Sequence, residues 1–201
     1  QTFYNLTFNG NGNTDLYTIA GGDTLVVTGT LTLTNGVVNN GTIDTRGDIV
    51  VASTADGGTT VIDFGNNALT QTLIHNGGSA PTLRLDAASD ASDTVVLNAN
   101  ATFGGINITD GFSGVVPFNF NGNGAGPYSL TIGINGFRQA AGTFTMTGST
   151  TIIGNFTATG GTLDTSTGSV SFRSNSAIGY TINYAPLTDV PPKLELTRPE
   201  G

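Results

Sequence analysis

The chain contains no cysteine, no tryptophan, a single histidine and a single lysine, and only 10% of its 201 residues are charged. Without cysteine it has no disulfide framework, no thiolate metal site and no cysteine nucleophile. Fourteen acidic and six basic residues give a net charge of −8. No basic patch is therefore available to neutralise a run of phosphates, and nucleic-acid binding is not expected.

Long apolar runs are missing as well. No stretch reaches the length of about 18 residues that a membrane-spanning helix needs, and the N-terminus carries no basic region followed by an apolar segment. The sequence thus predicts no membrane insertion, and either a leader was removed or the chain is cytosolic. An acidic, lysine-poor composition rich in Thr, Asn and Gly favours export, so we expect an extracellular or cell-surface location with the leader removed.

Small polar residues take the place of the usual helix formers. The chain has 30 glycines, 34 threonines and 20 asparagines, a composition that argues against an all-helical protein. Hydrophobic residues make up 37%, which is enough for a buried core. Apolar and polar residues alternate over short stretches separated by Gly and Asn-Gly turns, which predicts an all-β fold.

The chain also repeats itself. The pentapeptide FNGNG occurs at Phe8–Gly12 and at Phe120–Gly124, and similar segments follow both copies in the same order, Gly41–Thr45 matching Gly161–Thr165 among them. This pattern predicts a degenerate tandem duplication. We expect a first repeat unit at residues 1–112, a second at 113–190 and an extended C-terminal strand or tail at 191–201.

Short, mutually similar strands with recurring Gly-Thr corners favour a parallel β-solenoid, and a pair of β-sandwiches is the alternative. With about 20 residues in each coil the chain would make about ten coils, and a strand spacing of about 4.8 Å would then give a rod roughly 45 Å long. Asp86–Ser113 departs from the pattern and receives no coil assignment.

Three segments carry a family resemblance: FYNLTF (Phe3–Phe8), LVVTGTLTLTNGVVNNGTIDTRGDIVV (Leu25–Val51) and GTFTMTGSTTIIGNFTATGGTLDTSTGSVSF (Gly142–Phe172). They resemble the repeats of large bacterial cell-surface β-solenoid proteins, including adhesin-like and filamentous-haemagglutinin-like chains. The resemblance rests on repeated Gly, Thr and apolar residues. It implies an extracellular structural or adhesive rod.

The ends of such a rod expose unpaired backbone groups and an apolar cross-section, and no amphipathic helix is available to cover them. We therefore expect head-to-tail assembly with copies of the same chain into a surface filament, sheath or matrix; the alternative is a segment of a longer repeat protein whose neighbours cover both ends. The expected assembly interface consists of Phe3, Leu6, Phe8, Pro192, Leu194 and Leu196.

Side chains suited to catalysis are sparse. His75 is the only histidine, so a two-histidine metal site is excluded. Its place before Asn76-Gly77 predicts a surface or corner position. Lys193 is the only lysine and Glu195 and Glu200 are the only glutamates, so the clustered groups of a polysaccharide-cleaving enzyme are hard to assemble. We expect a non-enzymatic protein without catalytic, cofactor-binding or metal-binding residues and without a cofactor.

The main alternative function is an adhesin or carbohydrate-binding segment that recognises surface glycans. Solvent-exposed aromatic side chains gathered on one face would favour it, and the candidates are Tyr128, Tyr180 and Tyr184.

Three weaker motifs have ordinary explanations as turns or outward ladders. Arg46-Gly47-Asp48 matches an integrin-binding tripeptide, and the alternating Asn9 to Asp15 segment resembles a calcium loop that has one carboxylate. Thr-x-Thr rows such as Thr28–Thr34 resemble those of ice-binding solenoids, which need such rows in register on one flat face.

Five asparagines head Asn-x-Ser/Thr sequons and are candidate glycosylation sites in an exported protein: Asn5, Asn40, Asn100, Asn107 and Asn155.

Overall fold

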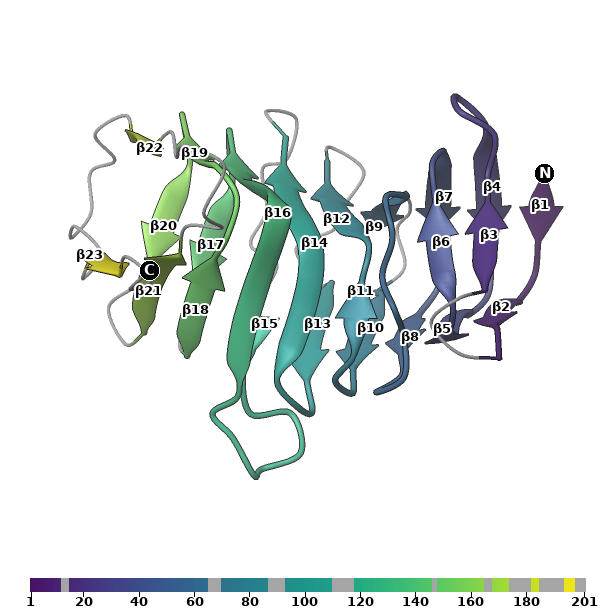
Figure 1. Cartoon of the computed structure of the whole chain (residues 1–201), viewed down its shortest axis with the longest axis horizontal. Helices are drawn as coiled ribbons and strands as arrows, with labels where there is room; N and C mark the ends of the chain where they lie inside the picture. The colour runs from purple at the N-terminus through teal and green to yellow at the C-terminus, as the bar shows by residue number, and fades with distance from the viewer. Residues whose placement is uncertain are drawn as a thin grey trace.

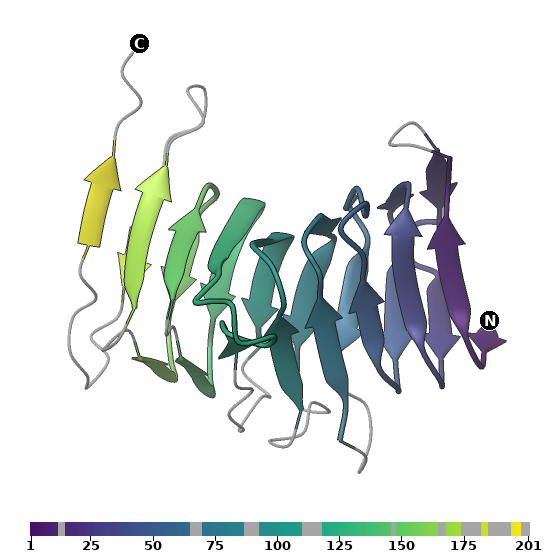
Figure 2. The same cartoon turned by 90° about the horizontal axis from the view of Figure 1, so that it is seen from below.

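The computed structural model describes residues 1–11, 15–64, 70–86, 93–109, 118–145, 148–164 and 168–173 in full, and the backbone of residues 182–184 and 194–197. Within these ranges the chain is all-β, with no helix. The strands follow one another along a single axis, with β1 at one end of the molecule and β22 and β23 at the other (Figure 1, Figure 2).

The 23 strands have the following bounds, from β1 to β12: Thr2–Phe3, Leu6–Asn9, Leu16–Thr18, Thr24–Val27, Leu31–Asn35, Val37–Asn39, Thr42–Thr45, Ile49–Val51, Val61–Phe64, Thr72–His75, Ser79–Ala80 and Thr82–Leu85. From β13 to β23 they are Thr94–Leu97, Ala101–Ile108, Phe118–Asn119, Ser129–Gln139, Thr143–Thr145, Ser149–Ile152, Phe156–Ala158, Thr162–Asp164, Ser169–Arg173, Ile182–Tyr184 and Leu194–Thr197.

Parallel pairing between successive turns makes this fold a β-solenoid, as the sequence predicts. A 13-stranded sheet follows the path β1-β4-β7-β9-β12-β14-β16-β18-β21-β23, with β11, β19 and β22 pairing beside it. A six-stranded sheet has the order β15-β13-β10-β8-β5-β2, and two-stranded sheets join β17 to β20 and β3 to β6. Each interior strand of the two large sheets pairs with strands from the turns before and after it, so these sheets run along the rod.

The number of residues in a turn is not constant along the rod. Near the N-terminus Thr24 pairs with Thr42, whereas farther along Ile106 pairs with Phe137, and the second of these turns contains many more residues than the first. The expected length of about 20 residues therefore fits turns such as that from Thr24 to Thr42 but not every turn. Residues 86–113, which received no coil assignment from the sequence, contain β13 and β14.

Alternation of inward apolar and outward polar side chains along most strands builds the core. Inward positions stack on each other from turn to turn, as in the row Leu31, Ile49, Leu73 and Val95, each of which is fully buried. In the C-terminal half phenylalanines fill the same interior, and the rings of Phe137 and Phe156 stack with centroids 5.3 Å apart. Burial of these rows is the main force that holds the solenoid together.

Segments that match between the two predicted repeat units lie in the same sheet at some positions and in different sheets at others. Both FNGNG copies begin near the end of a strand of the six-stranded sheet, β2 and β15. Farther along, β7 belongs to the 13-stranded sheet, whereas its expected match β20 pairs with β17 in a separate sheet. Pairing of β13 with β15 and of β14 with β16 also makes both large sheets continuous across residues 112 and 113.

Candidate functional site

The N-terminal turn forms one end of the rod and leaves one edge of each of its strands open. In the described part of the chain, β1 pairs only with β4, β2 only with β5 and β3 only with β6. Every interior strand of a parallel sheet has two partners, whereas each strand of this turn has one. Its outward edge therefore presents backbone N–H and C=O groups that a further parallel strand can pair with.

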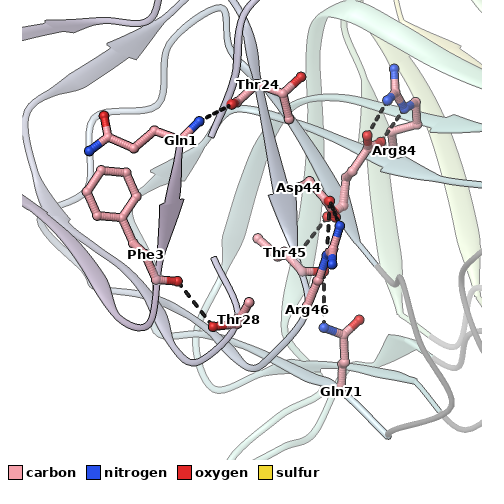
Figure 3. Close-up of polar contacts among 10 residues, drawn as sticks. Gln1, Phe3, Thr24, Thr28, Asp44, Thr45, Arg46, Gln71 and Arg84 are labelled. Carbon is pink, nitrogen blue, oxygen red and sulfur yellow. Dashed lines mark hydrogen bonds and ion pairs between the residues drawn. The ribbon is translucent and has the colours of Figure 1, made fainter. Parts of the chain in front are cut away.

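Hydrogen bonds fix this first turn to the second. The amino group of Gln1 donates to the carbonyl of Thr24 at 3.2 Å, and the hydroxyl of Thr28 donates to the carbonyl of Phe3 at 3.3 Å (Figure 3). The backbone N–H of Thr30 donates to Oδ1 of Asn5 at 2.7 Å. The open edge is thus held in the conformation of a regular solenoid turn.

Apolar side chains gather at the same end. Phe8 is only 8% exposed and packs edge-on against Tyr17, with ring centroids 5.1 Å apart. Leu6 is partly buried against the core, whereas Tyr4 is 76% and Leu16 61% exposed. Ile134, at 66%, is the third large exposed hydrophobic residue of the described ranges, so two of the three lie in the first turn. The sequence analysis did not name Tyr4 and Leu16; Leu16 lies at an outward position of β3, next to Tyr17, whose side chain packs against the core.

The opposite end also presents open strands. Backbone pairing places Leu194 beside Val170 and Leu196 beside Phe172, so the expected C-terminal strand continues the 13-stranded sheet as β23. In the described part of the chain, β23 pairs only with β21 and β22 only with β19. Pro192 and the side chains of Leu194 and Leu196 lie outside the described residues.

The side of the rod near the first turns carries compensated charges. Asp44, Asp63 and Arg84 are register partners on successive turns. Arg84 binds Asp63 through Nε and Nη2, and Arg46 binds Asp44 at 3.0 Å (Figure 3). Burial raises the pKa of the Asp63 carboxyl, although the guanidinium of Arg84 acts in the opposite direction. The pair of Arg84 with Asp63 ties β12 to β9, whereas Arg46 and Asp44 belong to the same segment, and both pairs leave little net charge for a ligand.

His75 is fully buried, so the expected surface or corner position is wrong. Its ring lies between Val51 and Leu97 of the neighbouring turns, at an inward position of β10. Nε2 lies 3.3 Å from the carbonyl of Thr102, and the ring meets Phe103 edge-on with centroids 4.9 Å apart. Burial lowers the pKa of His75 to about 4, so the imidazole is neutral at pH 7.

The integrin-like tripeptide is engaged in the architecture of a corner. Arg46 binds Asp44, and Oδ1 of Asp48 accepts a hydrogen bond from the N–H of Thr72 at 2.9 Å. A Cβ on Gly47 would lie 2.1 Å from the carbonyl oxygen of Gly29, so only glycine fits there. These contacts favour the interpretation of Arg46-Gly47-Asp48 as a structural corner.

The expected glycosylation sites differ in accessibility. Asn5, Asn40, Asn100 and Asn155 are exposed, whereas Asn107 is half-buried on β14. Oδ1 of Asn100 accepts a hydrogen bond from the N–H of Ser129 at 3.0 Å, and Oδ1 of Asn107 accepts one from Arg138 at 3.3 Å. Attachment of glycans at these positions stays a prediction.

Neither a metal cluster nor an aromatic platform is found in the described ranges. No group of three or more His, Asp or Glu side chains there could hold a metal ion, and no helix there could cross a lipid bilayer. Tyr128 is half-buried with its hydroxyl on Oδ1 of Asn123, while Tyr180 and the side chain of Tyr184 lie outside the described residues. The cluster of exposed aromatics that would favour carbohydrate binding is therefore not seen in the part described.

Comparison with protein-family models, with curated proteins and with solved structures gave no match to this chain. The functional argument accordingly rests on the geometry of the chain itself, and the resemblance to bacterial surface β-solenoids stays an expectation.

Proposed function

We propose that the chain is a non-enzymatic, extracellular structural protein that assembles end to end with copies of itself into a surface filament, sheath or matrix. The open first turn carries the proposal. Three parallel strands with one unpaired edge each lie there beside the exposed side chains of Tyr4 and Leu16. At the other end β22 and β23 offer open parallel strands to a following copy.

The mechanism is continuation of the solenoid across the subunit boundary. A copy stacked on the first turn would supply parallel strands to β1, β2 and β3 and cover Tyr4, Leu16 and the half-buried Phe3 and Leu6. Burial of one large apolar side chain contributes about 1.5 to 3 kcal/mol before the ordering cost of association is subtracted. Since one end binds the other, the contact is heterologous and produces an open filament.

A charge placed at the junction tests this proposal. Leu16→Lys should weaken self-association at least about tenfold, because it removes an apolar side chain from the contact and adds a charge that must be desolvated. Ile134→Lys is the matched control, since Ile134 is about equally exposed but lies on β16, away from both ends of the rod.

Sedimentation velocity over a range of protein concentrations gives the association constant of each variant. The proposal predicts a large loss for Leu16→Lys and little change for Ile134→Lys. Equal behaviour of both variants, or a wild-type chain that stays monomeric at all concentrations, would contradict it.

A further inference from the structure

A column of hydroxyl groups runs along the outer face of the 13-stranded sheet. Its members are register partners on five successive turns: Ser79, Thr102, Thr131, Thr151 and Ser171. They alternate along their strands with buried residues such as Ile132 and Ile152, so their side chains point outward. All five are half-buried at the level of the whole residue.

A second column lies two residues earlier on three of the same strands. It consists of Ser129, Ser149 and Ser169, which are again register partners. Strands β16, β18 and β21 therefore display Ser-x-Thr, Ser-x-Thr and Ser-x-Ser side by side. The strand spacing of about 4.8 Å and the advance of about 6.7 Å for two residues set the two repeats of this array.

The hydroxyls of the array are not used by the protein. Within the described ranges none of the eight makes a side-chain hydrogen bond, whereas the hydroxyls of Thr45, Thr54 and Thr60 each donate to a carbonyl of a neighbouring turn. None of the eight carries a charge. The array is thus a regular set of free donors and acceptors on a rigid backbone.

We propose that this hydroxyl array binds ice. Each hydroxyl offers one donor and two acceptors at a position fixed by the parallel ladder, and the threonine methyl groups add apolar surface between them. A crystal of ice presents water oxygens in rows that repeat over similar distances in two dimensions, so many weak contacts form together. A polysaccharide is the poorer candidate, because its sugar rings are held by aromatic side chains, which the array lacks.

The sequence alone could not reveal this array. The Thr-x-Thr rows visible in the sequence belong to different sheets: Thr32 lies on β5, in the six-stranded sheet beside Thr7 and Val50, and Thr157 on β19 pairs with Arg138. The columns on β16, β18 and β21 mix serine with threonine, and only the register of the folded turns brings them together.

Thermal hysteresis and the inhibition of ice recrystallisation test the proposal directly. Thr131→Tyr and Thr151→Tyr put a bulky ring in the middle of the array and should each lower both activities at least about fivefold. Thr32→Tyr is the control, since Thr32 is an equally half-buried outward threonine on the six-stranded sheet. Circular dichroism and thermal melting verify that each variant retains the fold.

The proposal is supported if the wild-type chain shapes ice crystals and the two array variants lose this activity while Thr32→Tyr keeps it. It is overturned if the wild-type chain shows no hysteresis, or if the control loses as much activity as the array variants. It is also overturned if the wild-type chain sediments with insoluble cellulose or chitin, loses that binding in the array variants and shows no effect on ice.

Discussion

The buried imidazole of His75 should make the solenoid less stable in mild acid. Its pKa is lowered to about 4 in the folded chain, against 6.5 for a free histidine, so the unfolded chain takes up more protons between these values. Stability is therefore complete above pH 6.5 and falls as the pH drops toward 4. A difference of one pKa unit corresponds to about 1.4 kcal/mol, which gives a loss of about 2 kcal/mol at pH 5 and about 3 kcal/mol below pH 4.

The effect of His75 can be separated from that of other titrating groups by comparison with His75→Leu. Leucine suits the inward row between Val51 and Leu97 and does not titrate. Asp63 also titrates differently in the folded chain, and because its pKa is raised it lowers stability as the pH rises. Both chains contain Asp63, so the difference between them reports His75 alone.

Urea denaturation followed by circular dichroism at pH 7.5 and pH 5.0 provides the measurement. The wild-type chain should lose about 2 kcal/mol more than His75→Leu on going from pH 7.5 to pH 5.0. If both chains lose the same amount, the imidazole is not held in a dry, neutral state and the reasoning about its burial is refuted.

Two further substitutions test the contacts that join successive turns. Arg84→Ala removes the partner of the mostly buried Asp63 carboxylate and should destabilise the fold by about 1 to 2 kcal/mol, since the pair is partly screened by solvent. The urea midpoint should recover in the double variant Arg84→Ala/Asp63→Asn, and a double variant without recovery would argue against the ion pair. Gly47→Ala would place a Cβ 2.1 Å from the carbonyl oxygen of Gly29. It should cost roughly 2 kcal/mol or more, and a melting temperature equal to that of the wild-type chain would show that this corner is not closely packed.

The general architecture could be predicted from the sequence because a parallel solenoid repeats a simple local rule. Alternation such as Val61-Ile62-Asp63-Phe64 places Ile62 and Phe64 inward, and the structure confirms that both are buried. Asn-Gly and Gly-Thr corners mark the turns, as at Asn40-Gly41, where Asn40 adopts a φ of 58°. These signals are local and do not depend on which turn lies next to which.

Features that depend on register between turns could not be predicted. The same alternation that buries Leu73 also directs His75 inward, but its place before the Asn76-Gly77 turn favoured a surface or corner position. The carbonyl that Thr102 supplies to its ring comes from another turn. The offset between paired strands changes from turn to turn along the rod, so the sequence does not show that Thr131 lies beside Thr102. The sequence likewise does not show that β7 and its expected match β20 lie in different sheets.

Electron microscopy of the purified chain at neutral pH tests end-to-end assembly most directly. The comparison sample is a chain that lacks residues 191–201 and hence β23, the last strand of the 13-stranded sheet. We expect the complete chain to form filaments whose subunits repeat on the order of every 40 Å, in keeping with turns stacked about 4.8 Å apart. We expect the truncated chain to form no filaments. Short separate rods in both samples would contradict the account.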